Sequence, residues 1–234
     1  MLALLFVAQS VLAQVAINPV QLDLTPQASS GLLALTNNSG AALRFAVSAK
    51  AWTQGPNGDM QLEDTRDITF YPAIFELPAG AVKRIRVGAV VPIVRGERTY
   101  RIFVEQLPSF DGAHVGIEVL TRLSIPIYLG EKAAPALPVI ANVRIDHGTL
   151  AFSVRNNGEA HFRIKEVRIS GRDVGGDAAF SKYETGWYVL GAGTRDYAVE
   201  LEDCTRLTSA ELVVETDTVT VRSRVPIVAS ACDP

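Results

Sequence analysis

Histidine and cysteine are the residue types in this chain that could most readily do chemistry. His114, His147 and His161 are its only histidines, and each lies near an expected turn or strand end. A copper or zinc site would need more imidazoles, at the spacing that metal ligands require. The sequence contains neither a G-x-S-x-G nucleophile motif nor a G-x-x-x-x-G-K-[ST] phosphate loop. We therefore predict no enzyme, no metal site and no cofactor.

The two cysteines, Cys204 and Cys232, both come late in the chain. Residues 1–13, MLALLFVAQSVLA, are almost wholly apolar, too short to span a bilayer, and end in small residues before Gln14. This pattern is typical of a secretory signal, although the stretch has no basic start; the alternative is a first strand or a buried helix. In an exported protein a cysteine pair favours a disulfide, and the alternative is two free buried thiols.

The composition excludes some classes of partner. Of the 234 residues, 48% are hydrophobic and 20% are charged, which is enough apolar material for a core. The formal net charge of −3 argues against nucleic acid, because proteins that bind it usually carry a basic excess. No later run has the ~20 apolar residues of a membrane helix, so we expect no membrane span.

Residues 115–128, VGIEVLTRLSIPIY, alternate between apolar and other side chains. One parity carries six aliphatic residues, which are Val115, Ile117, Val119, Leu123, Ile125 and Ile127. A period of two predicts a β-strand with one apolar face. Pro126 cannot donate to a ladder, so the pattern indicates an edge strand or a bulge. A long apolar edge strand invites aggregation unless something covers it.

The rest of the chain reads as short strands separated by turns, which predicts an antiparallel sandwich. Residues 130–138, GEKAAPALP, break the pattern and read as a linker. The stretch LLALTNNSGAALRFAV is echoed by LAFSVRNNGEAHFRIKEV, and FELPAGAVKRIRV by YVLGAGTRDYAVEL. We therefore expect a signal at 1–13, one sandwich domain at 14–129, the linker, and a second domain at 139–234.

The ordered set RDITFYPAIFELPAGAVKRIRVG, GERTYRIFVEQLP and VLTRLSIPIYLG resembles the periplasmic chaperones of chaperone–usher pili, and its details resemble the archaic branch. The resemblance covers nearly the whole mature chain. It implies an all-β fold of two immunoglobulin-like domains set at an angle. It also implies partners: pilin subunits, which are sandwiches lacking their last strand, and an outer-membrane usher.

For such a chaperone, the resemblance implies that the alternating strand serves two sheets. Leu123 to Ile127 would help to build the first domain, while Val115, Ile117 and Val119 would fill the groove of a pilin by strand addition. The alternative is that all six aliphatic residues pack only into the chain's own core. Edge protection by self-association of the free protein is a further expectation.

Many family members anchor the client's C-terminal carboxylate with an Arg in the first strand and a Lys in the donor strand. Here the matching positions fall at or beside Gln21 and near Ser124, and neither residue is basic. If the hairpin of 98–106 and 115–128 centres near residues 110–111, Arg122 lies opposite about Arg98 to Tyr100. A substitute anchor could then form from Arg98, Arg101 and Arg122, since Arg forks bind carboxylates well; the alternative is a solvated sheet face.

These observations predict a non-enzymatic, ATP-independent periplasmic chaperone for pilus subunits. The rival hypothesis is a secreted two-domain sandwich that is a structural or adhesive component of a surface fibre. A polymerising subunit should carry a free, alternating N-terminal extension, and QVAINPVQLDLTP could be read so, but Pro19 argues against it.

Overall fold

The computed structural model describes residues 14–55, 57–108, 119–131 and 135–232. Its described elements are β-strands and two short 3-10 turns, η1 (Cys204–Arg206) and η2 (Ala229–Ala231). None of the helices in these residues has the length and apolarity needed to cross a bilayer. The expectation of an all-β, two-domain sandwich is confirmed.

The chain divides into two compact units. Unit 1 holds the described residues up to Lys50, those of Asp64–Pro92, and those between Tyr100 and Tyr128. Unit 2 holds the described residues of Ala51–Glu63, Ile93–Thr99 and those from Leu129 onward. The segments 51–63 and 93–99, which the sequence assigns to the first domain, are therefore grouped with unit 2 by their contacts.

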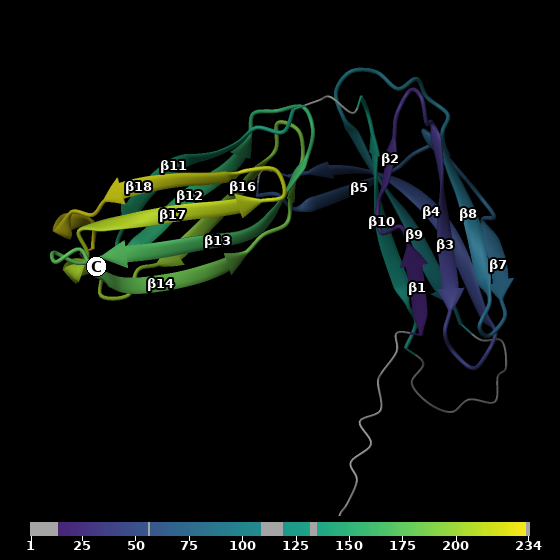
Figure 1. Cartoon of the computed structure of the whole chain (residues 1–234), viewed down its shortest axis with the longest axis horizontal. Helices are drawn as coiled ribbons and strands as arrows, with labels where there is room; N and C mark the ends of the chain where they lie inside the picture. The colour runs from purple at the N-terminus through teal and green to yellow at the C-terminus, as the bar shows by residue number, and fades with distance from the viewer. Residues whose placement is uncertain (1–13, 56, 109–118, 132–134, 233–234) are drawn as a thin grey trace, which may run out of the picture. The chain divides into compact units, whose positions relative to one another are not determined.

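The strands up to the predicted linker form two sheets (Figure 1). One has the order β1-β3-β8-β6, and the other the order β2-β10-β9-β4-β5, with β7 also beside β4. Their bounds are β1 (Val15–Asn18), β2 (Leu22–Leu24), β3 (Ser30–Asn37), β4 (Leu43–Gln54), β5 (Met60–Asp64), β6 (Ile68–Tyr71), β7 (Ile74–Leu77), β8 (Val82–Ala89), β9 (Arg98–Leu107) and β10 (Arg122–Leu129).

The alternation of apolar residues explains these sheets. Leu33 and Leu35 in β3 are fully buried, and so are Ile85 and Val87 in the neighbouring strand β8. Their sequence neighbours point to the opposite face, because successive side chains of a strand alternate. Ile102, Val104, Ile125 and Ile127 are buried in the same way in the second sheet, so each sheet contributes one apolar face to the core.

The first two strands belong to different sheets. β1 pairs with β3, whereas β2, which follows the cis Asn18–Pro19 bond, lies beside β10. Of the two expectations for this strand, an edge or a bulge, the edge is wrong, since β10 lies between β2 and β9. The sequence did not reveal this because the pairing joins segments about one hundred residues apart.

Unit 2 is a second sandwich (Figure 1). Its sheets have the orders β11-β12-β16 and β14-β13-β17-β18, with β15 beside β13. The core lies between them and includes Phe152, Phe162 and Val199. The bounds are β11 (Pro138–Asp146), β12 (Thr149–Asn156), β13 (Phe162–Arg172), β14 (Ala178–Thr185), β15 (Tyr188–Val189), β16 (Thr194–Glu200), β17 (Ser209–Thr216) and β18 (Thr220–Pro226).

The end of the predicted linker is fixed to unit 2. The carbonyl of Pro135 accepts hydrogen bonds from the backbone N–H groups of Glu159 and Ala160, and the carbonyl of Leu137 accepts one from Asn157. The Leu137 N–H donates to Oδ1 of Asn156. Residues 135–137 are thus an ordered extension of the second sandwich.

Candidate functional site

The predicted donor strand continues β10 toward its N-terminal side. Val115 and Ile117 lie outside the described residues. Val119 is described, and 81% of its surface is exposed, whereas Ile125 and Ile127 on the same parity are buried. The aliphatic stripe therefore passes from core packing at 125–127 to an exposed valine at 119.

Side-chain contacts fix how β9 and β10 face each other. The Gln106 N–H donates to the Thr121 carbonyl at 2.8 Å, and Arg122 Nε lies 2.9 Å from Glu105 Oε1. The Arg122 guanidinium also lies over the Phe103 ring, 4.3 Å from its centroid. The expectation that Arg122 lies opposite Arg98 to Tyr100 is therefore wrong, since its neighbours are Phe103 and Glu105.

Arg101 is a buried arginine on the same face of β9 as Phe103 and Glu105. It is only 4% exposed, and its Nη1 donates to Oγ of Ser124 on β10 at 3.1 Å. Ser124 is the place where the resemblance puts the anchoring lysine. The structure thus brings a guanidinium to that place from the neighbouring strand.

The three candidate anchor arginines do not share one face. Arg98 and Arg101 are three residues apart in β9, so their side chains leave the strand on opposite sides. Arg122 contacts Phe103 and Glu105, which share a face of β9 with Arg101. Arg101 in turn contacts Ser124, which shares a face of β10 with Arg122. Arg101 and Arg122 therefore lie on one side of the sheet, and Arg98 lies on the other.

Gln21, at the other anchor position, makes a local contact. Its Nε2 lies 3.2 Å from Oδ2 of Asp23, and both residues flank Leu22, whose side chain is buried. Because alternate residues share a face, Gln21 and Asp23 lie on the outer face of β2. The outer face at β2 therefore offers the amide of Gln21 and the carboxylate of Asp23 in place of a basic side chain.

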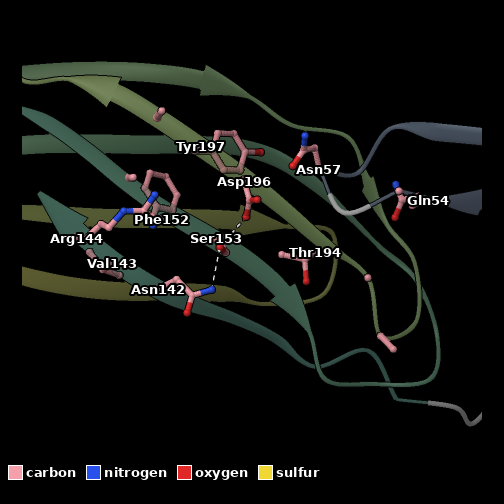
Figure 2. Close-up of a pocket in the computed structure, with 15 residues that line it drawn as sticks. Gln54, Asn57, Asn142, Val143, Arg144, Phe152, Ser153, Thr194, Asp196 and Tyr197 are labelled. Atoms are coloured by element: carbon pink, nitrogen blue, oxygen red, sulfur yellow. Dashed lines mark hydrogen bonds between the residues drawn. The ribbon is translucent and has the colours of Figure 1, made fainter. Parts of the chain in front are cut away.

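A groove lies in unit 2, and the sequence does not predict it. A groove of about 1140 Å³ runs over the outer face of β11, β12 and β16. In Figure 2 a polar row crosses these strands: Asn142 Nδ2 donates to Ser153 Oγ at 3.3 Å, and Ser153 Oγ donates to Asp196 Oδ1 at 2.7 Å. A β-bulge at 142–143 opens the groove, and a bulge carries no motif in sequence.

The chemistry of this row is limited. The Ser153 hydroxyl bonds the Asp196 carboxylate directly, with no imidazole between them to remove the proton as in a catalytic triad. No group of three or more His, Cys, Asp or Glu side chains suited to a metal ion occurs among the described residues. The groove can offer hydrogen bonds to a polar molecule, and nothing in it selects one.

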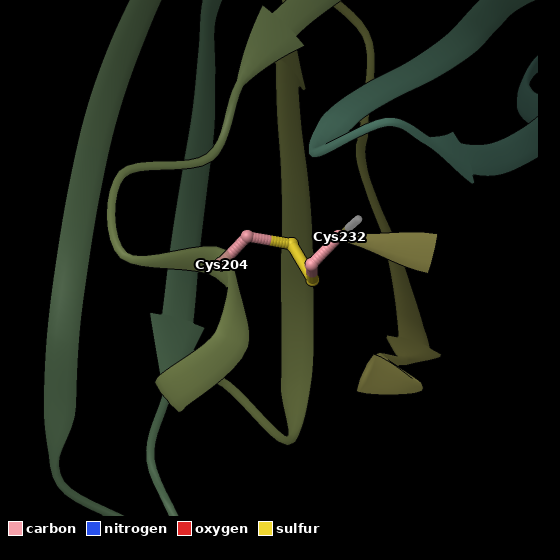
Figure 3. The surroundings of a disulfide bond; sticks show 2 residues. All are labelled: Cys204 and Cys232. Atoms are coloured by element: carbon pink, nitrogen blue, oxygen red, sulfur yellow. A yellow bond between two sulfur atoms is a disulfide. The ribbon is translucent and has the colours of Figure 1, made fainter. Parts of the chain in front are cut away.

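Cys204 and Cys232 form a disulfide (Figure 3). Cys204 begins η1, and Cys232 directly follows η2, which comes after the last strand, β18. Their Cα atoms are 5.6 Å apart, a normal separation for a disulfide. The bond ties the end of the described chain to the core of unit 2, where Cys204 is buried.

Comparison with known proteins gives matches in structure. No protein-family model matches the chain, and no curated protein matches its sequence. A solved complex of the chaperone CsuC with the tip adhesion subunit CsuE, from the archaic chaperone–usher Csu pili of Acinetobacter baumannii, matches with a TM-score of 0.64. That match has 19% identity and covers 91% of this chain and 98% of the other.

Two further chaperones match over similar lengths. The class 5 fimbriae chaperone CfaA matches with a TM-score of 0.59 and 16% identity, covering 91% of this chain and 99% of CfaA. The Pseudomonas aeruginosa chaperone CupB2 matches with a TM-score of 0.57 and 11% identity, covering 91% of this chain and 100% of CupB2. This chain therefore has the two-domain β-sandwich fold of the chaperone–usher pilus chaperones, the fold that its sequence resemblance predicts.

Proposed function

We propose that this protein is a non-enzymatic periplasmic chaperone that binds a pilus or fimbrial subunit by donating a strand. The observation that carries the proposal is the apolar stripe of β10, which is buried at Ile125 and Ile127 and emerges as exposed Val119. Val115 and Ile117 belong to the same parity in sequence. In this proposal the three residues fill the open groove of a subunit, while main-chain hydrogen bonds supply affinity.

Arg101 and Arg122 are the proposed contacts for the subunit's terminal carboxylate. Arg101 is the stronger candidate, because its guanidinium already reaches the Ser124 hydroxyl on the donor strand. Two N–H groups of one guanidinium can bond both carboxylate oxygens. Arg122 would first have to leave Glu105, which is half exposed and competes for the same charge.

Delivery to an outer-membrane usher completes the proposed role. Release would follow when the next subunit's own extension replaces the lent strand, and this exchange needs no nucleotide. Residues 1–13 would direct export and then be removed. The disulfide in unit 2 suits an oxidising compartment such as the periplasm.

The structure weakens the rival hypothesis of a polymerising fibre subunit. Such a subunit needs a free N-terminal extension to donate. Here Val15–Asn18 pair with β3, and Leu22–Leu24 lie beside β10. The segment that could have served as an extension is part of both sheets of the chain's own sandwich.

Native mass spectrometry tests the proposal. The chain is exported together with the pilin encoded in its own gene cluster, purified through a C-terminal tag, and weighed. We expect a one-to-one complex that Val119→Asp removes and that Val174→Asp leaves intact. Val174 is a matched control, since it is 88% exposed and lies in the turn between β13 and β14 of unit 2. A bare monomer from the unmodified chain would overturn the proposal.

A further inference from the structure

The ladder between β9 and β10 ends at a pair made by a side chain. The Gln106 N–H donates to the Thr121 carbonyl, as in an ordinary antiparallel rung. The return bond is different, because the Thr121 N–H donates to Oε1 of the Gln106 side chain at 3.3 Å. The side chain of Gln106 thus occupies the acceptor position that a backbone carbonyl of β9 would otherwise fill.

Gln106 is placed to do this by the core. It shares the parity of Ile102 and Val104, which are fully buried, and is itself only 9% exposed. The adjacent pair, Glu105 with Arg122, has the same register, so two successive positions agree. The amide therefore caps the inner face of β9 at the point where the apolar core ends.

Pairing stops beyond this point. β9 ends at Leu107 and β10 begins at Arg122. The backbones of Val119 and Leu120 make no hydrogen bond to any described residue, and both side chains are exposed. Thr121 is also the one polar residue that interrupts the stripe between Val119 and Leu123. The structural end of the ladder coincides with the boundary between the core part and the exposed part of the strand.

We propose that Gln106 is a positioning residue that ends the chain's own pairing at Thr121 and so leaves the backbone of Val119 and Leu120 available to a subunit. This inference rests on the proposed function and adds to it the residue at which the donated part of the strand ends. The point at which the strand passes from the chain's own sheet to the subunit is then set by one side-chain amide on the neighbouring strand. Without the Oε1 acceptor, the Thr121 N–H can donate to a backbone carbonyl of β9 instead. The two strands can then form further backbone hydrogen bonds or shift their register.

The experiment compares three variants in the full-length protein. Gln106→Met keeps the side chain's size and removes the acceptor, whereas Gln106→Glu keeps an acceptor oxygen. Thr121→Val retains both bonds, because Thr121 takes part through its backbone alone. Binding of the gene-cluster pilin is measured by competition. If the two strands then pair by one further hydrogen bond, a subunit must break that bond to bind, which predicts about 5-fold weaker binding for Gln106→Met. The other two variants should bind within about 2-fold of the unmodified chain.

Two further readouts separate positioning from general destabilisation. Exchange of the Thr121 amide, followed by NMR in the free protein, should accelerate in Gln106→Met and stay slow in Gln106→Glu. Ile85→Val lowers stability from a buried site in β8, far from this hairpin in the sheet order, and should leave pilin binding unchanged. Equal exchange in all variants, or equal weakening by Ile85→Val, would overturn the inference.

The failure of the proposed function looks different. If the unmodified chain captures no pilin, both the chaperone role and this boundary role fall. If the unmodified chain binds and Val119→Asp abolishes binding while Gln106→Met binds normally, the chaperone role stands and the positioning role of Gln106 is refuted.

Discussion

Asn37 and Asn156 hold corresponding turns with corresponding hydrogen bonds. Nδ2 of Asn37 donates to the carbonyls of Ala41, Leu77 and Pro78. Nδ2 of Asn156 donates to those of Ala160, Val189 and Leu190. In each case Oδ1 accepts the backbone N–H two residues on, from Ser39 and Gly158. Both asparagines are fully buried, so the internal echo of the sequence is a repeated structural unit.

Replacing either asparagine should destabilise its sandwich. Asn37→Ala and Asn156→Ala each remove three donor contacts and one acceptor contact with a backbone N–H from a turn around a fully buried side chain, and we expect a loss of about 2–4 kcal/mol. Asn→Asp should be at least as harmful, because a carboxylate would face the same carbonyls. Urea unfolding measures both effects. Asn157→Ala is the matched control, since exposed Asn157 bonds Leu137 through its backbone N–H, and a comparable loss there would contradict the assigned role.

The repeat extends to the turn that each asparagine holds, and one copy carries a strained residue. Gly80 and Ala192 occupy the same place and have φ values of 69° and 56°. A side chain is disfavoured in this left-handed region. Ala192→Gly should therefore raise stability by about 0.5–1 kcal/mol and Gly80→Ala should lower it by about the same. No heavy atom lies within 4 Å of a Cβ built at Gly80, so thermal unfolding of that variant reports backbone strain alone; unchanged stability would refute it.

The disulfide should account for a large part of the stability of unit 2. Cys204 and Cys232 close a loop with a sequence separation of 28, for which chain entropy predicts about 3–4 kcal/mol. The double variant Cys204→Ala/Cys232→Ala should lower the urea midpoint by the corresponding amount, and dithiothreitol should do the same to the unmodified chain. Reductant should have no effect on the double variant. A shift there would show that the reductant acts elsewhere.

Because the phenol of Tyr197 is buried, we expect the folded protein to lose stability at alkaline pH. Burial raises the pKa of its phenol above 10.0, and the positive charge of Arg195 lowers it by less. The folded state therefore keeps the proton when the unfolded state has lost it, so stability is full below about pH 10 and falls as pH rises through the folded pKa. Tyr197→Phe should remove this part of the decline.

Tyr197→Phe should cost little at neutral pH. The Tyr197 hydroxyl is buried and makes no hydrogen bond to another described residue, while its ring stacks on Phe152 with centroids 5.1 Å apart. Phenylalanine keeps the stack and removes the desolvated hydroxyl. Chemical unfolding at pH 7 and pH 11 checks both statements. A large loss at pH 7 would mean that the hydroxyl has a partner.

Much of the fold could be predicted because its main signal is local. Alternation located the strands, and the Asn-Asn and Gly turns located their ends. The features that the sequence did not predict depend on contacts between segments far apart in the chain. The position of β2 beside β10 and the pairing of Gln106 with Thr121 are set by sheet closure and by a side-chain bond, and neither has a sequence signature.

The candidate site was predicted unevenly for similar reasons. The exposure of Val119 agrees with the family resemblance, which assigns Val119 to the subunit, whereas the alternation alone also allows core packing. Arg98 was grouped with Arg101 and Arg122, although a spacing of three residues in a strand already separates the faces. The bond from Arg101 to Ser124 could have been suspected, since a missing lysine at Ser124 leaves room for a cation from the adjacent strand.

The place of Cys232 beyond β18 has a consequence for biosynthesis. The disulfide joins Cys204 in η1 to a residue that follows every strand of unit 2. It can therefore close only after all of those strands have been synthesised. Formation of the bond therefore reports that the end of unit 2 has folded, because the two sulfurs meet only when η1 and the turn η2 are in place.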